Sequence, residues 1–470
     1  MKIFNKFFSF YLSSSLVLFP ASLAVSCSGI SEQKGPQLPK LKNNKLDFSL
    51  KKLGSSENYR FDYNKTKMDE YINYGSEKFL NKSEKNNYLS KRKVQYRNAW
   101  DRAFQEAKNK FQIDINKEIS KNISFDKLSS FSLNLDQIHN LPENKIFDFL
   151  GTKVKLKLSN YFFTFKDKGY LEPNLESNEV KKRISNLQKQ RKFIIIVSFN
   201  FTISVDDKNI SDFTLEVKKE TEIELKKTLG EFYDQLIVNL NELPQININW
   251  DAPEIKNTYF DGVIANEADG DTYTIMVTDN HNNNSVKIGD RVKVRLSGID
   301  TPEKAVDKQQ ASAFEQSFAL LSSKFVSQLM NNKLNNGIKV GDKLRVGFSS
   351  GIDTFLRTLG DVFFGDKYQY SYNLSIVSEG YTLPYINNAG WQNNINVQNT
   401  YENILYPQIY KQFNKAISDE KGFFELFNSP NDVQNFVYLK KPNGKWTPFW
   451  SGTPNNSNSG KVSNFLENKE

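Results

Sequence analysis

Residues 292–303 read VKVRLSGIDTPE, and the fold of the C-terminal half of the chain is best inferred from this stretch. Apolar and basic side chains alternate over its first five residues, which is typical of a strand with one buried face. The strand leads into a turn whose backbone is restricted by Pro302. Asp300 follows Arg295 by five residues, and Glu303 lies three residues further on, so both carboxylates leave the end of one strand.

Two other motifs stand on either side of this stretch. Asp269-Gly270-Asp271-Thr272 lies between two strand-like runs, residues 259–265 and 272–277, and predicts a hairpin turn. Residues 355–364 read FLRTLGDVFF and predict a strand that carries Arg357. Each motif alone is a weak signal, because Asp-Gly turns are common. The three in this order are much more specific.

These residues can in principle handle a phosphodiester. Asp271 and Asp300 are hard oxygen donors, which Ca²⁺ prefers. The planar guanidinium groups of Arg295 and Arg357 match phosphate oxygens. A bound metal polarises a nonbridging oxygen, and Glu303 can take a proton from an attacking water.

The ordered set resembles the staphylococcal (thermonuclease-type) nucleases over about residues 259–424. The similarity includes ASAF at 311–314, Asn373 with Glu379-Gly380, and DEKG at 419–422. It implies a five-stranded OB-type barrel with flanking helices. Together with the helix and strand patterns before residue 245, this predicts an α+β chain in which the barrel follows a separate α+β domain. The resemblance also implies Ca²⁺-dependent hydrolysis of DNA and RNA by an endonuclease of the thermonuclease type.

The resemblance assigns a metal-binding role to three residues. Asp271 and Asp300 match the carboxylates that bind calcium, and Thr301 matches the residue that offers its backbone carbonyl to the ion. Asp269 matches a neighbouring acidic position of the same loop.

The resemblance also assigns the catalytic residues. Glu303 matches the general base that acts on water. Arg295 and Arg357 match the two arginines that bind the phosphate and stabilise the charge of the pentacoordinate state.

The chain departs from the family pattern at two places and matches it at two tyrosines. Phe355-Leu356-Arg357 stands where the family has Tyr-Gly-Arg or Tyr-Asp-Arg, so the tyrosine hydroxyl that touches a phosphate is missing. Tyr381 and Tyr385 lie where the family places tyrosines that stack on bases. The segment between Thr272 and Arg295 is longer and predicts an elongated polar hairpin.

The composition excludes several classes of site. The 470 residues include one cysteine and two histidines, which rules out an intrachain disulfide and a multi-cysteine zinc site. His139 and His281 lie far apart in sequence, which argues against a histidine-based triad. The formal net charge of +9 suits a polyanionic partner, although lysine-rich surfaces commonly serve solvation.

The N-terminus predicts secretion and lipid anchoring. Residues 1–26 have a lysine-bearing start and an apolar run that is short for a membrane span, as in a signal peptide. Ala24-Val25-Ser26-Cys27 resembles a bacterial lipobox, in which Cys27 receives a diacylglyceryl group. Two acyl chains give stable anchoring. We therefore expect the mature protein on the extracellular face of the cell membrane, with residues 27–57 as a tether.

The rest of the chain divides into three predicted regions. Residues 58–245 predict an accessory α+β domain, residues 255–425 the nuclease-like domain, and residues 426–470 a polar tail. The accessory domain is expected to contain helices at 89–111 and 224–243 and strands at 151–165, 193–205 and 213–217. No motif within it points to a partner or a reaction.

Two alternatives to an active surface nuclease remain open at this point. The barrel can be a catalytically silent module that binds nucleic acid. The chain can also be an adhesive surface lipoprotein whose accessory domain does the work.

Overall fold

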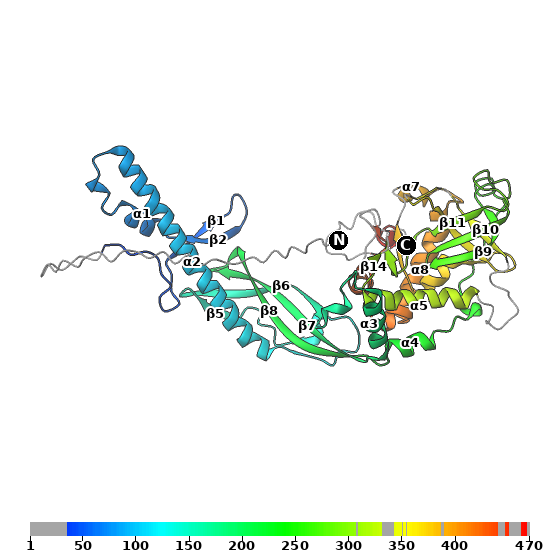
Figure 1. Ribbon diagram of the computed structural model, residues 1–470, viewed down its shortest axis with the longest axis horizontal. Coiled ribbons are helices and arrows are strands. Elements are labelled where there is room, and N and C mark those ends of the chain that lie inside the picture. Colours follow the sequence, from blue (N-terminus) through cyan, green and yellow to red (C-terminus); the bar gives the residue numbers. More distant parts are fainter. Residues whose placement is uncertain are drawn as a thin grey trace, which may run out of the picture. The chain divides into compact units, whose positions relative to one another are not determined.

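Figure 1 shows the computed structural model of the chain. It describes residues 35–306, 309–330, 343–349, 351–353, 355–386, 390–439, 447–450 and 462–467, of which the side chains of 267–269, 306 and 330 are left aside. The predicted signal peptide and Cys27 lie outside these residues, and so does the side chain of Asp269. No helix within the described ranges has the length and apolar character needed to cross a bilayer.

The chain divides into two compact units. Among the described residues, 35–50 and 61–107 form one unit, and 51–60 together with residues from 108 onward form the other. Helix α2 (Lys82–Asn122) crosses from the first unit into the second. The limits predicted above for the accessory and nuclease-like domains stay predictions.

The first unit has a small aromatic core. Helix α1 (Lys65–Asn73) starts at Asn64, whose side chain accepts a hydrogen bond from the backbone of Lys67. The buried residues that pack together are Met68, Tyr71, Ile72 and Tyr96. The guanidinium of Arg92 covers the ring of Tyr71 at 3.8 Å from its centre.

The second unit begins with a long antiparallel sheet. Its strands are β5 (Ile146–Phe149), β6 (Thr152–Phe165), β7 (Lys192–Val205) and β8 (Lys208–Glu224), in the order β8-β7-β6-β5. Strands β1 (Phe48–Lys52) and β2 (Asn58–Tyr63) extend it beyond β8. Phe111 of α2 packs on Phe149 and Phe213 of the sheet. The three predicted strands lie within β6, β7 and β8.

The prediction of one helix over residues 224–243 is wrong, because the α-helix found there is much shorter. Strand β8 runs to Glu224, and helix α4 (Leu229–Gln235) starts only at Thr228, which forms a capping box with Glu231. A short 3₁₀ turn at Leu240–Glu242 follows. Between α4 and this turn the backbone bonds to a side chain instead, since the Gln328 amide donates to the Leu236 carbonyl and accepts from the N–H of Val238.

The C-terminal part contains the expected barrel. Strands β9 (Phe260–Asp269), β10 (Thr272–Asp279), β11 (Arg291–Leu296), β15 (Leu344–Gly347) and β16 (Thr358–Phe364) pair in the order β11-β10-β9-β15-β16. A parallel pairing of β11 with β16 closes the sheet. The prediction of a five-stranded barrel with flanking helices is therefore confirmed.

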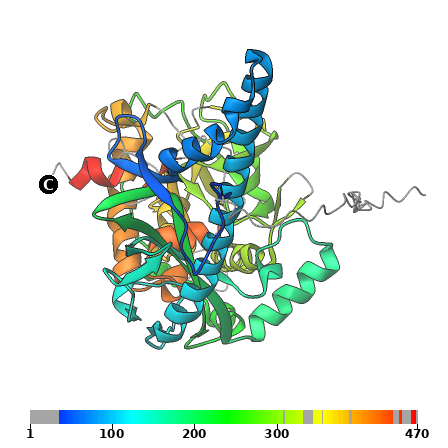
Figure 2. The same cartoon turned by 90° about the vertical axis from the view of Figure 1, so that its left-hand side faces the viewer.

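Helices and short strands surround the barrel. The helices are α5 (Ala313–Met330), α6 (Tyr372–Ser378), α7 (Trp391–Asn394), α8 (Tyr401–Ser418) and α9 (Pro430–Phe436). Helix α10 (Val462–Glu467), red in Figure 2, lies against α8. Strand β12 (Ile299–Asp300) pairs with β18 (Leu383–Ile386), which also pairs with β19 (Thr447–Pro448).

One α-helix and five two-residue strands remain among the described elements. They are α3 (Ser177–Lys189), β3 (Ser124–Phe125), β4 (Ile138–His139), β13 (Ala305–Val306), β14 (Gln309–Gln310) and β17 (Tyr370–Ser371). Helix α8 ends at Ser418, because Glu420 and Gly422 have positive φ and the chain then forms a 3₁₀ turn. Of the region read as a polar tail, α9 and β19 are packed into the fold.

Candidate active site

The site is built around the turn between β9 and β10. Gly270 lies so close to α5 and to the Asp300 turn that an added Cβ would stand 3.0 Å from Ser322 Cβ and 3.0 Å from Thr301 Cγ2. A glycine is needed here because of this close approach. The turn therefore holds Asp271 against the segment that contains Asp300 and Thr301.

The strand register gathers the charged residues at one end of the barrel. Thr272 of β10 is the partner of Arg295 on β11, and Arg295 is the partner of Leu359 on β16. Arg357 precedes Leu359 by two residues. The sequence motifs that carry Asp271, Arg295 and Arg357 therefore meet in space, although they are far apart along the chain.

Arg295 lies between the two predicted calcium ligands. Its guanidinium forms ion pairs with both Asp271 and Asp300. All three residues are at most 4% exposed. Buried carboxylates need a positive charge or several hydrogen bonds, and one arginine here serves two of them.

Thr301 contacts the same carboxylate through two donors. Its backbone N–H and its hydroxyl both donate to Oδ2 of Asp271, at 2.8 and 2.9 Å. The backbone carbonyl of Asp300 accepts from Thr382 Oγ1 and from Tyr438 OH, each at 2.7 Å. These bonds fix the backbone of the turn that presents Asp300 and Thr301.

Arg357 is connected to this cluster through a hydroxyl. Its Nη1 donates to Thr272 Oγ1 at 3.0 Å, and Thr272 Oγ1 donates to Asp271 Oδ1 at 3.2 Å. On its other side, Nε and Nη2 of Arg357 contact Asp353 Oδ2 at 2.8 and 2.7 Å. Burial alone would raise the pKa of Asp353, but hydrogen bonds from the backbone and guanidinium of Arg357 hold it below its usual value.

Glu303 lies at the edge of the site. It is partly buried, and its backbone N–H donates to Glu315 Oε1 at 3.3 Å. Glu315 is fully buried in the first turn of α5. The structure thus brings Glu303 into the same turn as Thr301, two residues away.

Four residues that contact the site were not singled out from the sequence: Thr382, Tyr438, Asp353 and Glu315. Tyr438 comes from the stretch read as a tail, and Thr382 from a segment without charge. Asp353 stands four residues before Arg357, a spacing that signals an ion pair only in a helix. Glu315 directly follows the ASAF motif, and nothing in its neighbours indicates that it is buried.

The prediction that Tyr381 and Tyr385 stack on bases is wrong. Tyr381 is 9% exposed and packs on Phe232, Phe325 and Phe423. Tyr385 is 2% exposed. Apolar burial keeps both rings in the core, so neither offers a face to a base.

Asp361 is a buried acid on β16 whose carboxylate accepts hydrogen bonds from uncharged groups. It is 0% exposed, and its carboxylate accepts from the backbone of Val362 at 2.7 Å, from the backbone of Asn373 at 3.2 Å and from the Ser371 hydroxyl. Burial raises its pKa to about 7.

The two carboxylates predicted to bind calcium are of a chemical type that suits a cation. Both are oxygen donors, and both already face one positive charge, the guanidinium of Arg295. In the part of the chain that the structure describes, no three His, Cys, Asp or Glu side chains gather as a ready metal cage. The calcium site at Asp271, Asp300 and Thr301 therefore stays a prediction.

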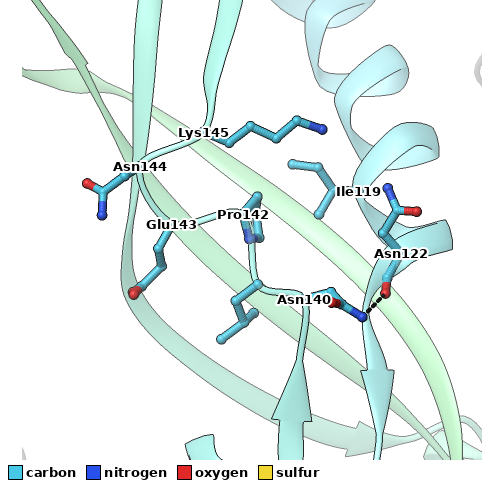
Figure 3. A pocket seen from close by; sticks show the side chains of 8 residues that line it. Ile119, Asn122, Asn140, Pro142, Glu143, Asn144 and Lys145 are labelled. Carbon is cyan, nitrogen blue, oxygen red and sulfur yellow. Dashed lines mark hydrogen bonds between the residues drawn. The ribbon is translucent and has the colours of Figure 1, made fainter.

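Two cavities lie away from this cluster. One of about 400 Å³ is lined by Glu254, Thr258, Ser297, Phe348, Leu359, Asn394, Asn399, Thr400, Tyr401 and Glu402. The other, of about 300 Å³, lies where the Asn140–Lys145 loop passes the end of α2, and Asn140 Nδ2 donates there to the Asn122 carbonyl at 3.1 Å (Figure 3). Neither is lined by a predicted catalytic residue.

Comparison with known proteins identifies a family for part of the chain. No curated protein matches the chain in a sequence search. The family model described as staphylococcal nuclease homologue matches residues 293–403, which include Arg295, Asp300, Thr301, Glu303 and Arg357. The chain therefore carries a staphylococcal nuclease homologue domain at residues 293–403.

Proposed function

We propose that the protein is a Ca²⁺-dependent nuclease that hydrolyses phosphodiester bonds of DNA and RNA while anchored at the cell surface. The family of residues 293–403 supports a role as a nuclease or in nucleic-acid binding. One observation favours cleavage: Asp271, Arg295 and Asp300 form one buried charge cluster, and Thr272 joins Arg357 to it.

Two carboxylates would hold the metal. Asp271 and Asp300 supply the charged oxygens, and Thr301, whose backbone lies against Asp271, is the third candidate ligand. A bound Ca²⁺ supplies Lewis-acid polarisation of a phosphoryl oxygen. The guanidinium of Arg295 neutralises both carboxylates in this structure, so it can serve a phosphate only if those carboxylates have another cation.

The arginines bind and stabilise the phosphate. Arg295 and Arg357 each present several N–H donors, and a phosphate that gains negative charge in the transition state binds such donors more strongly than the ground state does. Asp353 binds Nε and Nη2 of Arg357. The remaining nitrogen, Nη1, donates to Thr272 and so faces the cluster.

Glu303 acts as the general base. Its carboxylate takes a proton from the attacking water. For this step the carboxylate must be held within hydrogen-bonding reach of that water. Pro302 before it and the bond from its backbone to Glu315 restrict the turn that carries it.

The direct test is digestion of a circular plasmid and of single-stranded RNA by the full chain. Cleavage is expected with Ca²⁺ and none with a chelator. Glu303→Gln keeps the size of the side chain but removes the basic oxygen, and it is expected to lose cleavage while it still binds nucleic acid. Cleavage that persists in Glu303→Gln contradicts the assignment.

A catalytically silent nucleic-acid-binding module is the second candidate. One observation favours it: Phe355 offers no hydroxyl to a phosphate. Salt-sensitive binding of DNA in Ca²⁺ without any product would support this candidate. Salt-sensitive affinity alone does not separate the two, because both require phosphate contacts.

Surface anchoring is part of the proposal. The lipobox-like Ala24-Val25-Ser26-Cys27 supports lipid attachment at Cys27, and the lysine-, asparagine- and phenylalanine-rich composition suits a wall-less bacterium of the mycoplasma kind. There, extracellular cleavage would supply nucleotides for uptake. Cys27→Ser is expected to release the protein from the membrane fraction and to abolish labelling by a radioactive fatty acid.

A further inference from the structure

Helix α5 touches the candidate site at two places. In its first turn, Glu315 is fully buried and accepts from the backbone of Glu303, while the backbone of Glu315 is capped by Ser312 Oγ at 3.1 Å. Two turns later, Ser322 lies against Gly270, next to Asp271. The position of α5 therefore sets both the Glu303 turn and the Asp271 turn.

The N-terminal end of α5 rests on an aromatic cluster that comes largely from the preceding domain. The Phe131 cluster consists of Phe131, Phe165, Phe193, Phe314 and Phe427. Phe131 is 0% exposed, and its ring centre lies 5.1 to 5.6 Å from the other four. Phe314 belongs to α5 and immediately precedes Glu315.

Backbone bonds reinforce this contact. The N–H of Phe131 donates to the Leu426 carbonyl at 2.7 Å. Just before α5, the Gln310 carbonyl accepts from the N–H of Asn174 at 3.0 Å. The first bond ties the 123–245 region to Leu426, directly after the nuclease-like domain, and the second ties it to the segment before α5 within that domain.

The C-terminal half of α5 is held by the last turn of α4 and by the segment that follows it. Lys324 Nζ donates to the carbonyls of Tyr233 and Asp234. Gln328 donates to the Leu236 carbonyl at 2.6 Å and accepts from the N–H of Val238 at 2.8 Å. Helices α3 and α4 lie beside α5 (Figure 1). Residues within 131–238 therefore contact α5 from its first turn to its last.

We propose that residues 123–245 serve the cleavage reaction as a positioning element, with Glu315 as the positioning residue through which α5 holds Glu303. The proposal rests on the proposed function, since it takes Glu303 as the base. A base displaced by about 1 Å can lose about a hundredfold in rate. The role of this domain is then mechanical support of the active site.

The test uses four variants of the full chain in Ca²⁺, with kcat, KM and the pH profile of kcat measured on a nucleic-acid substrate. Glu315→Ala removes the acceptor for the Glu303 N–H, and Glu315→Gln keeps an acceptor oxygen. Phe131→Ala empties the centre of the Phe131 cluster. Phe213→Ala is the matched control, because Phe213 is 1% exposed and packs on Phe149 and Phe111 within the sheet and α2.

We expect kcat to fall about tenfold or more in Glu315→Ala and in Phe131→Ala, with KM within about twofold of the parent. Glu315→Gln should restore most of kcat. Phe213→Ala should leave kcat within about twofold at a temperature where circular dichroism shows all variants folded. If Phe131→Ala does not fold, Phe131→Leu replaces it.

Two results would overturn the proposal. One is an unchanged kcat and pH profile in Glu315→Ala while Glu303→Gln is inactive. The other is an equal loss of kcat in Phe131→Ala and Phe213→Ala, which would indicate a general effect of destabilisation. Both leave the proposed function standing. Equal activity of Glu303→Gln and the parent would instead remove the proposed function, and this inference with it.

Discussion

Replacement of Asp361 by asparagine is expected to change how stability depends on pH. The carboxyl is fully buried on β16, and burial raises its pKa from 3.8 to about 7. The folded state therefore binds this proton more tightly than the unfolded state does. Its contribution to stability is fully present below pH 4 and is lost as the pH rises from about 4 to about 7.

The size of the effect follows from the shift. A shift of about 3 pKa units corresponds to about 4 kcal/mol at about 1.36 kcal/mol per unit, which we take as an upper bound. Asparagine keeps an oxygen that can accept from the backbone of Val362 and Asn373, and it does not ionise. The stability of Asp361→Asn relative to the parent should therefore rise by up to about 4 kcal/mol between pH 4 and pH 8.

Urea unfolding of both proteins at several pH values between 4 and 8 measures this difference. Tryptophan fluorescence is a suitable probe, because Trp250 packs on Phe363 of β16 at a ring separation of 5.0 Å. A difference in unfolding free energy that stays constant across this range, within error, would refute the reasoning. A smaller rise would mean that water or local movement relieves the buried charge.

Three other substitutions have defined outcomes. Gly270→Ala places a Cβ 3.0 Å from Ser322 Cβ, and thermal unfolding should show a loss of about 1–3 kcal/mol; an unchanged melting temperature would contradict the close packing. Tyr438→Phe removes a donor to the Asp300 carbonyl and an acceptor for the Leu383 N–H, so urea unfolding should show a loss of about 1–3 kcal/mol. A neutral result would mean that water replaces the hydroxyl. Asp353→Asn should lower kcat/KM about tenfold by loosening Arg357, and normal kinetics would show that Arg357 needs no support.

The strands and the charged cluster could be predicted because they depend on local patterns. Alternation in VKVRL predicts β11, and the Asp-Gly turn predicts the β9–β10 hairpin. Once these pair, register alone brings Arg295 opposite Thr272. The family resemblance then supplied the closure of the barrel, which no single strand reveals.

The rest depends on contacts between distant segments. Nothing around Glu315 or Tyr438 in the sequence shows that one is buried beneath Glu303 and the other bonded to Asp300. Likewise, the leucines at 225–240 are spaced as in a helix, but α4 ends at Gln235 and a separate 3₁₀ turn forms at Leu240–Glu242. Tyr381 and Tyr385 are buried because neighbouring phenylalanines and β18 enclose them, which their spacing does not show.

Cleavage of a circular plasmid by the full chain, with Glu303→Gln measured beside it, tests the proposed nuclease most directly. Glu420→Gln, on an exposed turn after α8, is a matched control for the loss of one carboxylate. We predict cleavage by the parent and by Glu420→Gln in Ca²⁺, none with a chelator, and none by Glu303→Gln. Cleavage that survives chelation, or that is undiminished in Glu303→Gln, would contradict a calcium-dependent nuclease with Glu303 as its base.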